Sequence, residues 1–372
     1  MLHVSDRQLY DEFGNPVFLT SINCHRNERR KDGGIYWTVD DVKRIKENGG
    51  NCVELHAELL HDWMPTKDLV DNSYFVNWLD NEVSWCEQYG IYYIINLRGF
   101  DVTNDWMMTD SFLPRWLWEG LYPYTYPPSA SEAAQVIIDF LNTDDPKQED
   151  NRRSWYDVWK FLANRYKNND HFLMGLMNEP FVTHLTTDTA IRQRLGRTYY
   201  TLMAQTVDAI RSVGSNHVVF IDHARVGGFE YHVNDPRPNT VIEAHAYISG
   251  THTIGDFKGY IDNYVDHYYV VFNMPLHMGE YGFFSPSKPA GWKSLLQQEV
   301  DYLDTKPIVG RQWHCWSHLY GEYWSHYTAA ESEEVLRIVL GGYAPTPTAL
   351  PFTDNFADLT KWTILKGTWG TK

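Results

Sequence analysis

Apolar runs of strand length alternate along this chain with segments whose apolar residues recur at helical spacing. The runs are rich in β-branched and aromatic residues, which strands favour. An alternation of strands and amphipathic helices is typical of parallel βαβ units. Eight such units follow one another, so we expect an α/β fold, a closed (β/α)8 TIM barrel, over residues 1–343.

The individual elements can be placed by their apolar runs and by the residues that start and stop helices. Thr38 and Asp41 form a capping pattern that opens the first helix, and Gly49 and Gly50 mark its end. Further helices are expected near 75–89, 154–167, 187–213, 257–270 and 332–342. The eight strands are predicted at 17–25, 51–58, 91–99, 172–180, 217–222, 240–247, 275–283 and 309–317.

A long segment between the third and fourth strands interrupts this alternation. Residues 99–153 exceed the length of an ordinary connection. Its aromatic residues include Trp106, Trp116, Trp118, Tyr122, Tyr124 and Tyr126. In barrels of this kind the loops that follow the strands build the active-site face. The segment is therefore a candidate wall of a substrate groove; alternatively, it is a packed structural cap.

A proline-rich segment, residues 344–351, separates the predicted barrel from the end of the chain. Such a composition is extended and fairly stiff, as in linkers between domains. Residues 352–372 are β-rich and aromatic but too few to form a module of their own. We expect them to be the truncated start of a C-terminal β-sandwich module.

Composition argues against two classes of partner. Asp and Glu outnumber Lys and Arg by 48 to 32, and the formal net charge of -16 repels nucleic acids and anionic lipids. No apolar run reaches the roughly 20 residues that a membrane helix needs. We therefore expect no nucleic-acid and no membrane partner. Aromatic residues make up 15% of the chain, and their flat faces suit stacking on sugars, although they also fill cores.

The cysteines show no pattern of a metal site or a disulfide framework. Cys24, Cys52, Cys86 and Cys315 lack CxxC spacing, and each lies in a segment predicted as strand or helix. We therefore expect buried thiols.

Two carboxylates stand where the active site of a barrel is expected. Glu179, within Asn178-Glu179-Pro180, ends the fourth predicted strand, and Glu280 lies at the end of the seventh. The carboxyl ends of barrel strands meet at one mouth, so the two side chains are predicted to face each other. Glycoside hydrolysis with retention needs such a pair, one general acid and one nucleophile. Alternatively, Asn-Glu-Pro is an ordinary turn sequence.

Four motifs in chain order resemble those of glycoside hydrolase family 5, the cellulase-type branch of the retaining barrel hydrolases. The resemblance covers about residues 1–343. The motifs are Asn-Glu-Pro at 178–180, His-x-Tyr at 245–247, Gly-Glu at 279–280 and Trp-Ser at 316–317. Their order and their barrel spacing make the resemblance specific.

The resemblance also implies roles for neighbouring side chains. Asn178 would bind the 2-hydroxyl of the sugar, and His245 would assist the acid/base. Tyr247 would hydrogen-bond the nucleophile Glu280, and Trp316 would floor the cleavage subsite. A phenol donor favours an ionised carboxylate, and an amide can both donate to and accept from a hydroxyl. Alternatively, His245 and Tyr247 are satisfied core residues and Trp316 is a packing residue.

Two positions depart from the family pattern. The family places an Arg on strand two and a His at the end of strand three, where this chain has Glu54 and Arg98. One hypothesis is that Arg98 reaches in, pairs with Glu54 and lowers the pKa of the nucleophile. A second is a purely structural ion pair between them. A third is that the predicted register of strand two is shifted.

The resemblance favours a retaining endo-β-1,4-glucanase that acts as a monomer on β-glycan polysaccharides and needs no metal or cofactor. β-Mannan is the alternative substrate. A catalytically silent, glycan-binding barrel is the alternative from another class, with the departures marking lost activity. Polymeric glycans do not enter cells, so we expect an extracellular protein whose signal peptide is absent from the chain as given.

Overall fold

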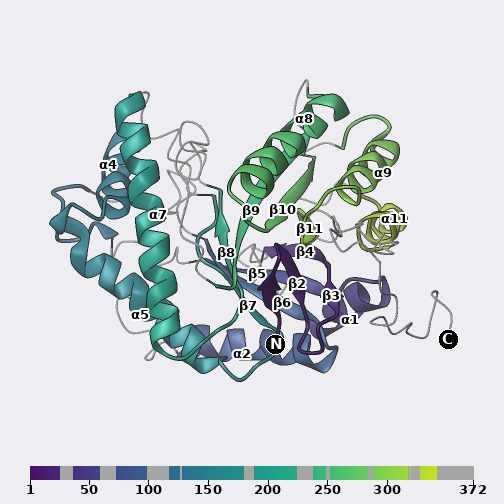
Figure 1. The fold of residues 1–372 in the computed structure, drawn as a ribbon, viewed down its shortest axis with the longest axis horizontal. Helices are drawn as coiled ribbons and strands as arrows, with labels where there is room; N and C mark the ends of the chain where they lie inside the picture. The colour runs from purple at the N-terminus through teal and green to yellow at the C-terminus, as the bar shows by residue number, and fades with distance from the viewer. Residues whose placement is uncertain are drawn as a thin grey trace, which may run out of the picture.

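Parallel strands close into a barrel, in the order β10-β11-β4-β5-β6-β7-β8-β9 (Figure 1). This computed structural model describes residues 1–25, 37–58, 73–98, 117–125, 128–179, 188–223, 238–248, 252–283, 288–316, 319 and 327–341. The barrel confirms the predicted (β/α)8 fold. Its strands are β4 (Leu19–His25), β5 (Cys52–Glu58), β6 (Tyr92–Arg98), β7 (Phe172–Gly175), β8 (Val219–Asp222), β9 (Thr240–Ile248), β10 (Leu276–Phe283) and β11 (Gly310–Trp313).

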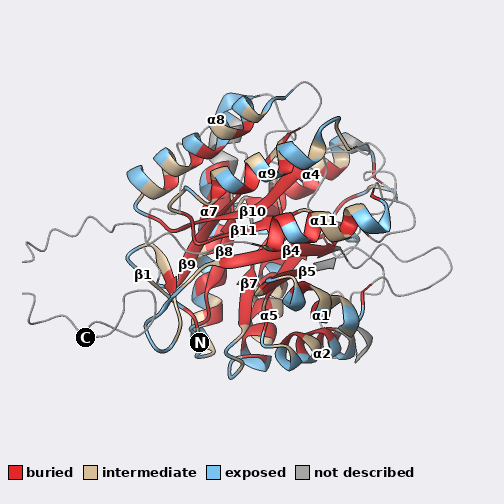
Figure 2. Cartoon of the chain, turned by 90° about the vertical axis from the view of Figure 1, so that its right-hand side faces the viewer, coloured by how far each residue is buried: buried red, intermediate tan, exposed pale blue. Residues whose placement is uncertain are grey.

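Helices surround the strands, with their outer faces exposed and the strands buried (Figure 2). Figure 1 shows α4, α5 and α7 together on one flank of the barrel and α8, α9 and α11 on the other. The described helices are α1 (Val39–Glu47), α2 (Ser73–Gln88), α4 (Ala130–Leu141), η3 (Pro146–Gln148), α5 (Glu149–Arg165), α7 (Thr189–Ser212), α8 (Ile254–Tyr264), the π-helical η4 (Val265–Val271), α9 (Trp292–Leu303) and α11 (Ala329–Leu340).

Helix α1 begins and ends where its sequence predicts. The Thr38 amide donates to Oδ2 of Asp41 at 2.8 Å, which completes a capping box. Val42 and Ile45 are buried against the barrel, three residues apart on one face of the helix. Gly49 follows the helix with a φ of +98°, a conformation that glycine adopts without strain.

A small antiparallel sheet that the sequence pattern does not predict closes the amino end of the barrel. Its strands are β1 (His3–Ser5), β2 (Gln8–Tyr10) and β3 (Pro16–Val17), too short for a period of two to stand out. Leu2 and Leu9 are buried in an apolar floor. That floor also contains Leu19, Cys52, Ile94, Leu173, Val218, Phe220, Val241 and Val309.

Above this floor the interior of the barrel is polar. Side chains alternate between the two faces of a strand, so Glu54, Asn96 and Glu243, each two positions beyond a floor residue, also point inward. Asn23, His277 and Gln312 are buried with them. Buried polar groups are costly unless they find partners, so this layer is held together by hydrogen bonds. It lies between the floor and the mouth, where the candidate site is built.

The described part of the excursion 99–153 contains helix α4, η3 and the start of α5. Trp118 and Tyr122 are buried in the hydrophobic core, and the Tyr122 hydroxyl donates to Oδ2 of Asp139 at 2.5 Å. These contacts favour the structural-cap interpretation for this part of the segment. Other aromatic residues of the excursion lie outside the described ranges, namely Trp106, Trp116 and Tyr126.

Two further sequence predictions can be compared with the structure. All four cysteines are buried thiols, as expected. Among the described helices, none combines the length and the apolar character needed to cross a membrane. The predicted linker 344–351 and module 352–372 lie outside the described residues, and that division stays a prediction.

Candidate active site

Glu179 and Glu280 meet at the carboxyl ends of the barrel strands. Glu179 follows β7, and Glu280 lies near the end of β10. One oxygen of each carboxylate and one nitrogen of His245 all lie within 4.8 Å of one another. The Glu280 side chain is 2% exposed and that of Glu179 is 12% exposed. Two carboxyl groups from distant parts of the chain therefore share one largely desolvated space.

The backbone of Glu179 is held in an unusual conformation. Strand β7 ends at Gly175, so Glu179 lies on the following turn, four residues beyond the strand that was predicted to extend to it. Its φ of +40° is in the left-handed region, which costs energy for a residue with a Cβ. The Glu179 amide donates to Oδ2 of Asp222 at 2.5 Å, and the Asn178 amide donates to the Leu97 carbonyl at 3.2 Å. These bonds to the flanking strands hold the turn.

Glu280 is positioned by a bulge in its strand. Met278 pairs with Ala244 of β9 and Glu280 pairs with His245, so Gly279 is one extra residue on β10. The Tyr247 hydroxyl donates to Oε2 of Glu280. Among the described residues no group hydrogen-bonds Oε1. One oxygen of this carboxylate is therefore anchored and the other is available for chemistry.

The His245 imidazole lies between four carboxyl groups. Its Nδ1 is 2.7 Å from Oε1 of Glu179 and 3.5 Å from Oε2 of Glu280. Its Nε2 is 3.5 Å from Oε1 of Glu243 and 3.7 Å from Oδ2 of Asp222. Burial lowers the pKa of His245, but the carboxyl groups around it, led by Asp222 and Glu280, outweigh burial and raise the pKa well above its usual value.

Asn178 and Trp316 are both buried. The amide Oδ1 and Nδ2 of Asn178 have no hydrogen-bond partner in the described part of the chain. Both atoms are therefore free to bind a hydroxyl, which the sequence interpretation requires. The Trp316 ring packs edge-on against Trp37, with 5.5 Å between the ring centroids. This contact fixes the orientation of Trp316.

Glu54 is held inside the barrel by amides. Nδ2 of Asn23 donates to its Oε2 at 2.8 Å, Nδ2 of Asn96 donates to its Oε1 at 2.5 Å, and Gln312 donates to Oε2. Strand β5 runs from Cys52 to Glu58 and the Glu54 side chain is buried; that Glu54 stands at the position of the family's Arg stays a prediction. Burial raises the pKa of Glu54 well above its usual value, and the nearby carboxyl groups add to this.

The predicted contact between Glu54 and Arg98 cannot be compared with the described part of the structure. In the pairing of β5 with β6, Glu54 lies opposite Ile94, whereas Arg98 lies four residues further toward the mouth, opposite Glu58. The Arg98 side chain is outside the described residues. Both hypotheses for this pair therefore stay predictions.

Three site residues were not singled out in the sequence: Asp222, Glu243 and His277. Nδ1 of His277 is 2.9 Å from Oε2 of Glu243. Burial raises the pKa of Asp222 well above its usual value. Burial also raises the pKa of Glu243, but the adjacent His245 and His277 rings outweigh it and lower the pKa to about 2. The signal in the sequence was a titratable residue in each of three apolar strands, 217–222, 240–247 and 275–283.

Two groups of side chains bring possible metal ligands together. One is Glu179, His245 and Glu280; the other is Asp222, Glu243 and His245. In both groups the shared member is the imidazole, whose Nδ1 is 2.7 Å from Oε1 of Glu179, whereas its Nε2 has no hydrogen-bond partner in the described part of the chain. We therefore interpret the two groups as carboxyl groups gathered around one imidazole ring.

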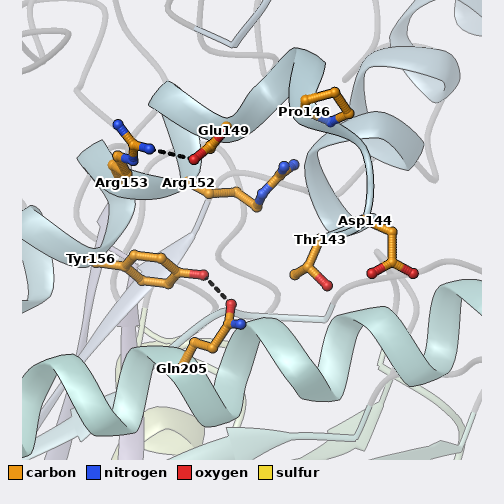
Figure 3. A pocket seen from close by; sticks show the side chains of 8 residues that line it. All are labelled: Thr143, Asp144, Pro146, Glu149, Arg152, Arg153, Tyr156 and Gln205. Atoms are coloured by element: carbon orange, nitrogen blue, oxygen red, sulfur yellow. Dashed lines mark hydrogen bonds and ion pairs between the residues drawn. The ribbon is translucent and has the colours of Figure 1, made fainter.

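A separate cavity of about 480 Å³ lies outside the barrel, between α5 and α7 (Figure 3). Two pairs of its side chains interact. Arg153 forms an ion pair with Glu149, and the Tyr156 hydroxyl donates to Gln205 at 2.6 Å. The cavity contains none of the candidate site residues, so it has no part in their chemistry.

The family model for cellulase (glycosyl hydrolase family 5) matches residues 10–319. None of the curated proteins compared with the chain matches it.

Among solved structures, endo-glycoceramidase II from Rhodococcus sp., in complex with a five-membered iminocyclitol, is 18% identical with a TM-score of 0.66, covering 87% of this chain and 80% of that one. Cellulose synthase subunit Z from Clostridioides difficile is 13% identical with a TM-score of 0.57, covering 87% and 99%. XacCel5A in complex with cellopentaose is 16% identical with a TM-score of 0.52, covering 81% and 89%. At these identities the similarity shows the fold alone.

Proposed function

The chain belongs to glycosyl hydrolase family 5, and from this premise we propose that it is a retaining endo-β-1,4-glucanase. Glu179 is the general acid/base and Glu280 is the nucleophile. The observation that carries the proposal is the spacing of these two groups, which bring one oxygen each within 4.8 Å of the other. Retaining glycosidases keep their two carboxyl groups about 5–5.5 Å apart, whereas inverting ones need about 6.5–9.5 Å.

In the first step, Oε1 of Glu280 attacks the anomeric carbon as the glycosidic bond breaks. Glu179 gives its proton to the departing oxygen, which leaves as the hydroxyl of the shortened glycan. The Tyr247 hydroxyl holds Oε2 of Glu280, so the attacking oxygen starts from a fixed position. The products of this step are a glycosyl ester on Glu280 and a Glu179 carboxylate.

In the second step, water opens the glycosyl ester. The Glu179 carboxylate takes a proton from the water as its oxygen attacks the anomeric carbon, and Glu280 leaves as a carboxylate. Two displacements on opposite faces restore the original anomeric configuration. The negative charge passes from Glu280 to Glu179 in the first step and back in the second, and His245 contacts both groups.

The choice of a β-1,4-glucan rests on the family match and on the resemblance in the sequence. β-Mannan stays the alternative, because the two sugars differ at the 2-hydroxyl that Asn178 would bind. A silent glycan-binding barrel is less consistent with an acid pair kept in a desolvated space, because such a pair costs stability. A polymeric substrate would place the protein outside the cell, which fractionation of the source organism into medium and cells would test.

A panel of substrates tests this proposal. Reducing-sugar release should be measured on carboxymethyl-cellulose, mixed-linkage β-glucan and β-mannan, with a glycosphingolipid as a fourth arm. Glu179→Gln and Glu280→Gln are the matched controls. We expect release from the glucans that is lost in both variants. Preferential release from mannan or glycolipid would overturn the substrate, and polymer binding without any release would favour the silent barrel.

A further inference from the structure

The carboxyl group nearest to Nε2 of His245 is that of Glu243. Both are buried, and Oε1 of Glu243 is 3.5 Å from Nε2 of His245. The other oxygen of Glu243 faces Nδ1 of His277 at 2.9 Å. Glu243 therefore lies between two histidine rings, one at the catalytic carboxylates and one deeper in the barrel.

The backbone of the barrel leaves room for this carboxylate. A Cβ on Gly279 would lie 2.2 Å from Cδ of Glu243, closer than atoms can approach. Gly279 is also the extra residue of the bulge that positions Glu280. The same glycine thus seats Glu243 and turns the neighbouring Glu280 toward the mouth.

The charges around the nucleophile need a positive partner. In the described ranges the basic groups within 4.0 Å of Glu280 are His245 and His314, whose Nε2 is 3.9 Å from Oε2. The acidic groups that face His245 or Glu280 come from every side: Glu179, Asp222, Glu243, Tyr247 and, below them, Glu54. An ionised Glu280 among these groups is stable only if a cation offsets them.

We propose that Glu243, held by His277, is a positioning residue that keeps His245 doubly protonated, and that this imidazolium supplies the positive charge at the nucleophile Glu280. With both nitrogens protonated, Nδ1 donates toward Glu179 and Glu280 and Nε2 donates toward Glu243 and Asp222. Glu179 carries its acidic proton on Oε2, because Oε1 accepts from the imidazolium. The inference rests on the proposed roles of the two carboxylates at this site.

The first arm of the test does not depend on turnover. In the full chain labelled with ¹⁵N-histidine, the His245 ring can be assigned by comparison with a His245→Gln variant. The ¹⁵N chemical shifts of the ring should show that both nitrogens are protonated from pH 5 to pH 8. In Glu243→Gln the ring should lose a proton within this range. A neutral His245 at pH 6 in the wild type would overturn the proposal even if the enzyme is fully active.

The second arm measures kcat/KM against pH on an aryl β-cellobioside, which needs no polymer. Loss of the imidazolium should move the acid limb of the Glu243→Gln profile to higher pH by about 1 unit or more. Glu299→Gln is the matched control, since Glu299 is equally buried but lies on α9 outside the site. His277→Asn, which keeps a donor near the position of Nδ1, should shift the limb less than Glu243→Gln.

Circular dichroism separates these outcomes from a folding defect. If Glu243→Gln does not fold, the wild-type ¹⁵N titration and the His277→Asn profile still decide. An acid limb of folded Glu243→Gln that coincides with the wild type would overturn the proposal. A wild type that cleaves no glycoside but shows a doubly protonated His245 would support this inference while contradicting the proposed function.

Discussion

The Tyr247 hydroxyl donates a hydrogen bond to Oε2 of Glu280, while no described residue hydrogen-bonds Oε1 of the same carboxylate. The phenol comes from β9 and the carboxylate from β10, so two adjacent strands of the barrel fix the geometry of the nucleophile. A donor to the charged form also favours ionisation. The hydrogen bond therefore serves both position and charge.

Removing this donor should slow the reaction. A hydrogen bond to a charged group contributes about 1.5–3 kcal/mol, so Tyr247→Phe should lower kcat/KM on an aryl β-cellobioside by about 10- to 100-fold. Equal kcat/KM values for wild type and variant would show that Tyr247 is only a core residue.

The acid/base role of Glu179 predicts a dependence on the leaving group. Glu179→Ala should lower kcat on a β-glucan by about 100- to 10,000-fold. A dinitrophenyl glycoside, whose leaving group needs no proton, should lose much less in the first step. Added azide should restore turnover and give a β-glycosyl azide, detected by mass spectrometry. Equal losses on both substrates would contradict this role.

A substitution at Gly279 tests whether the Glu243 side chain needs the space that this glycine leaves. The alanine methyl of Gly279→Ala would overlap the Glu243 carboxyl group, so we expect a loss of about 1–3 kcal/mol in the free energy of unfolding, together with lower kcat. Gly259→Ala on α8 is the control, because nothing lies within 4 Å of its added methyl group and helix propensity favours alanine. Urea unfolding in which Gly279→Ala is as stable as the wild type would show that the barrel accommodates the methyl.

The buried carboxyl group of Glu299 should make the stability of the protein depend on pH. Its two carboxyl oxygens have no hydrogen-bond partner in the described part of the chain, and burial raises its pKa well above the usual value. Its contribution to stability is therefore complete below the unfolded pKa of about 4.3 and is lost as the pH rises from there toward the folded pKa.

Glutamine cannot ionise, so the Tm of Glu299→Gln relative to the wild type should improve by about 2 °C or more between pH 4 and pH 7. Differential scanning calorimetry at both pH values measures this difference. A constant Tm difference across the range would mean that the Glu299 carboxyl group has the same pKa in the folded and unfolded states.

Local signals in the sequence were enough to predict the barrel and part of its site. The capping pattern of Thr38 with Asp41 and the apolar strand ending in Arg98 are features of contiguous residues, and the structure has both elements. Glu179 and Glu280 could be paired because all strand ends of a closed barrel share one mouth.

Other features depend on contacts between distant strands. Glu243 finds its partners on β10 and in its own strand, and nothing in the run 240–247 identifies them. The amides around Glu54 come from β4, β6 and β11, which are known to be close only once the barrel is closed. The sheet β1-β2-β3 was missed because its strands of two or three residues carry almost no periodicity.

Trapping the covalent intermediate tests the central claim most directly. A 2-deoxy-2-fluoro-β-cellobioside with a dinitrophenyl leaving group should inactivate the enzyme by glycosylating the nucleophile. Fluorine slows both steps, and the activated leaving group speeds the first step alone, so the glycosyl-enzyme accumulates. We predict one added fluorocellobiosyl group per chain, located by peptide mass spectrometry on Glu280 and absent from Glu280→Gln. A label on any other residue, or hydrolysis with inversion and no label, would contradict the account.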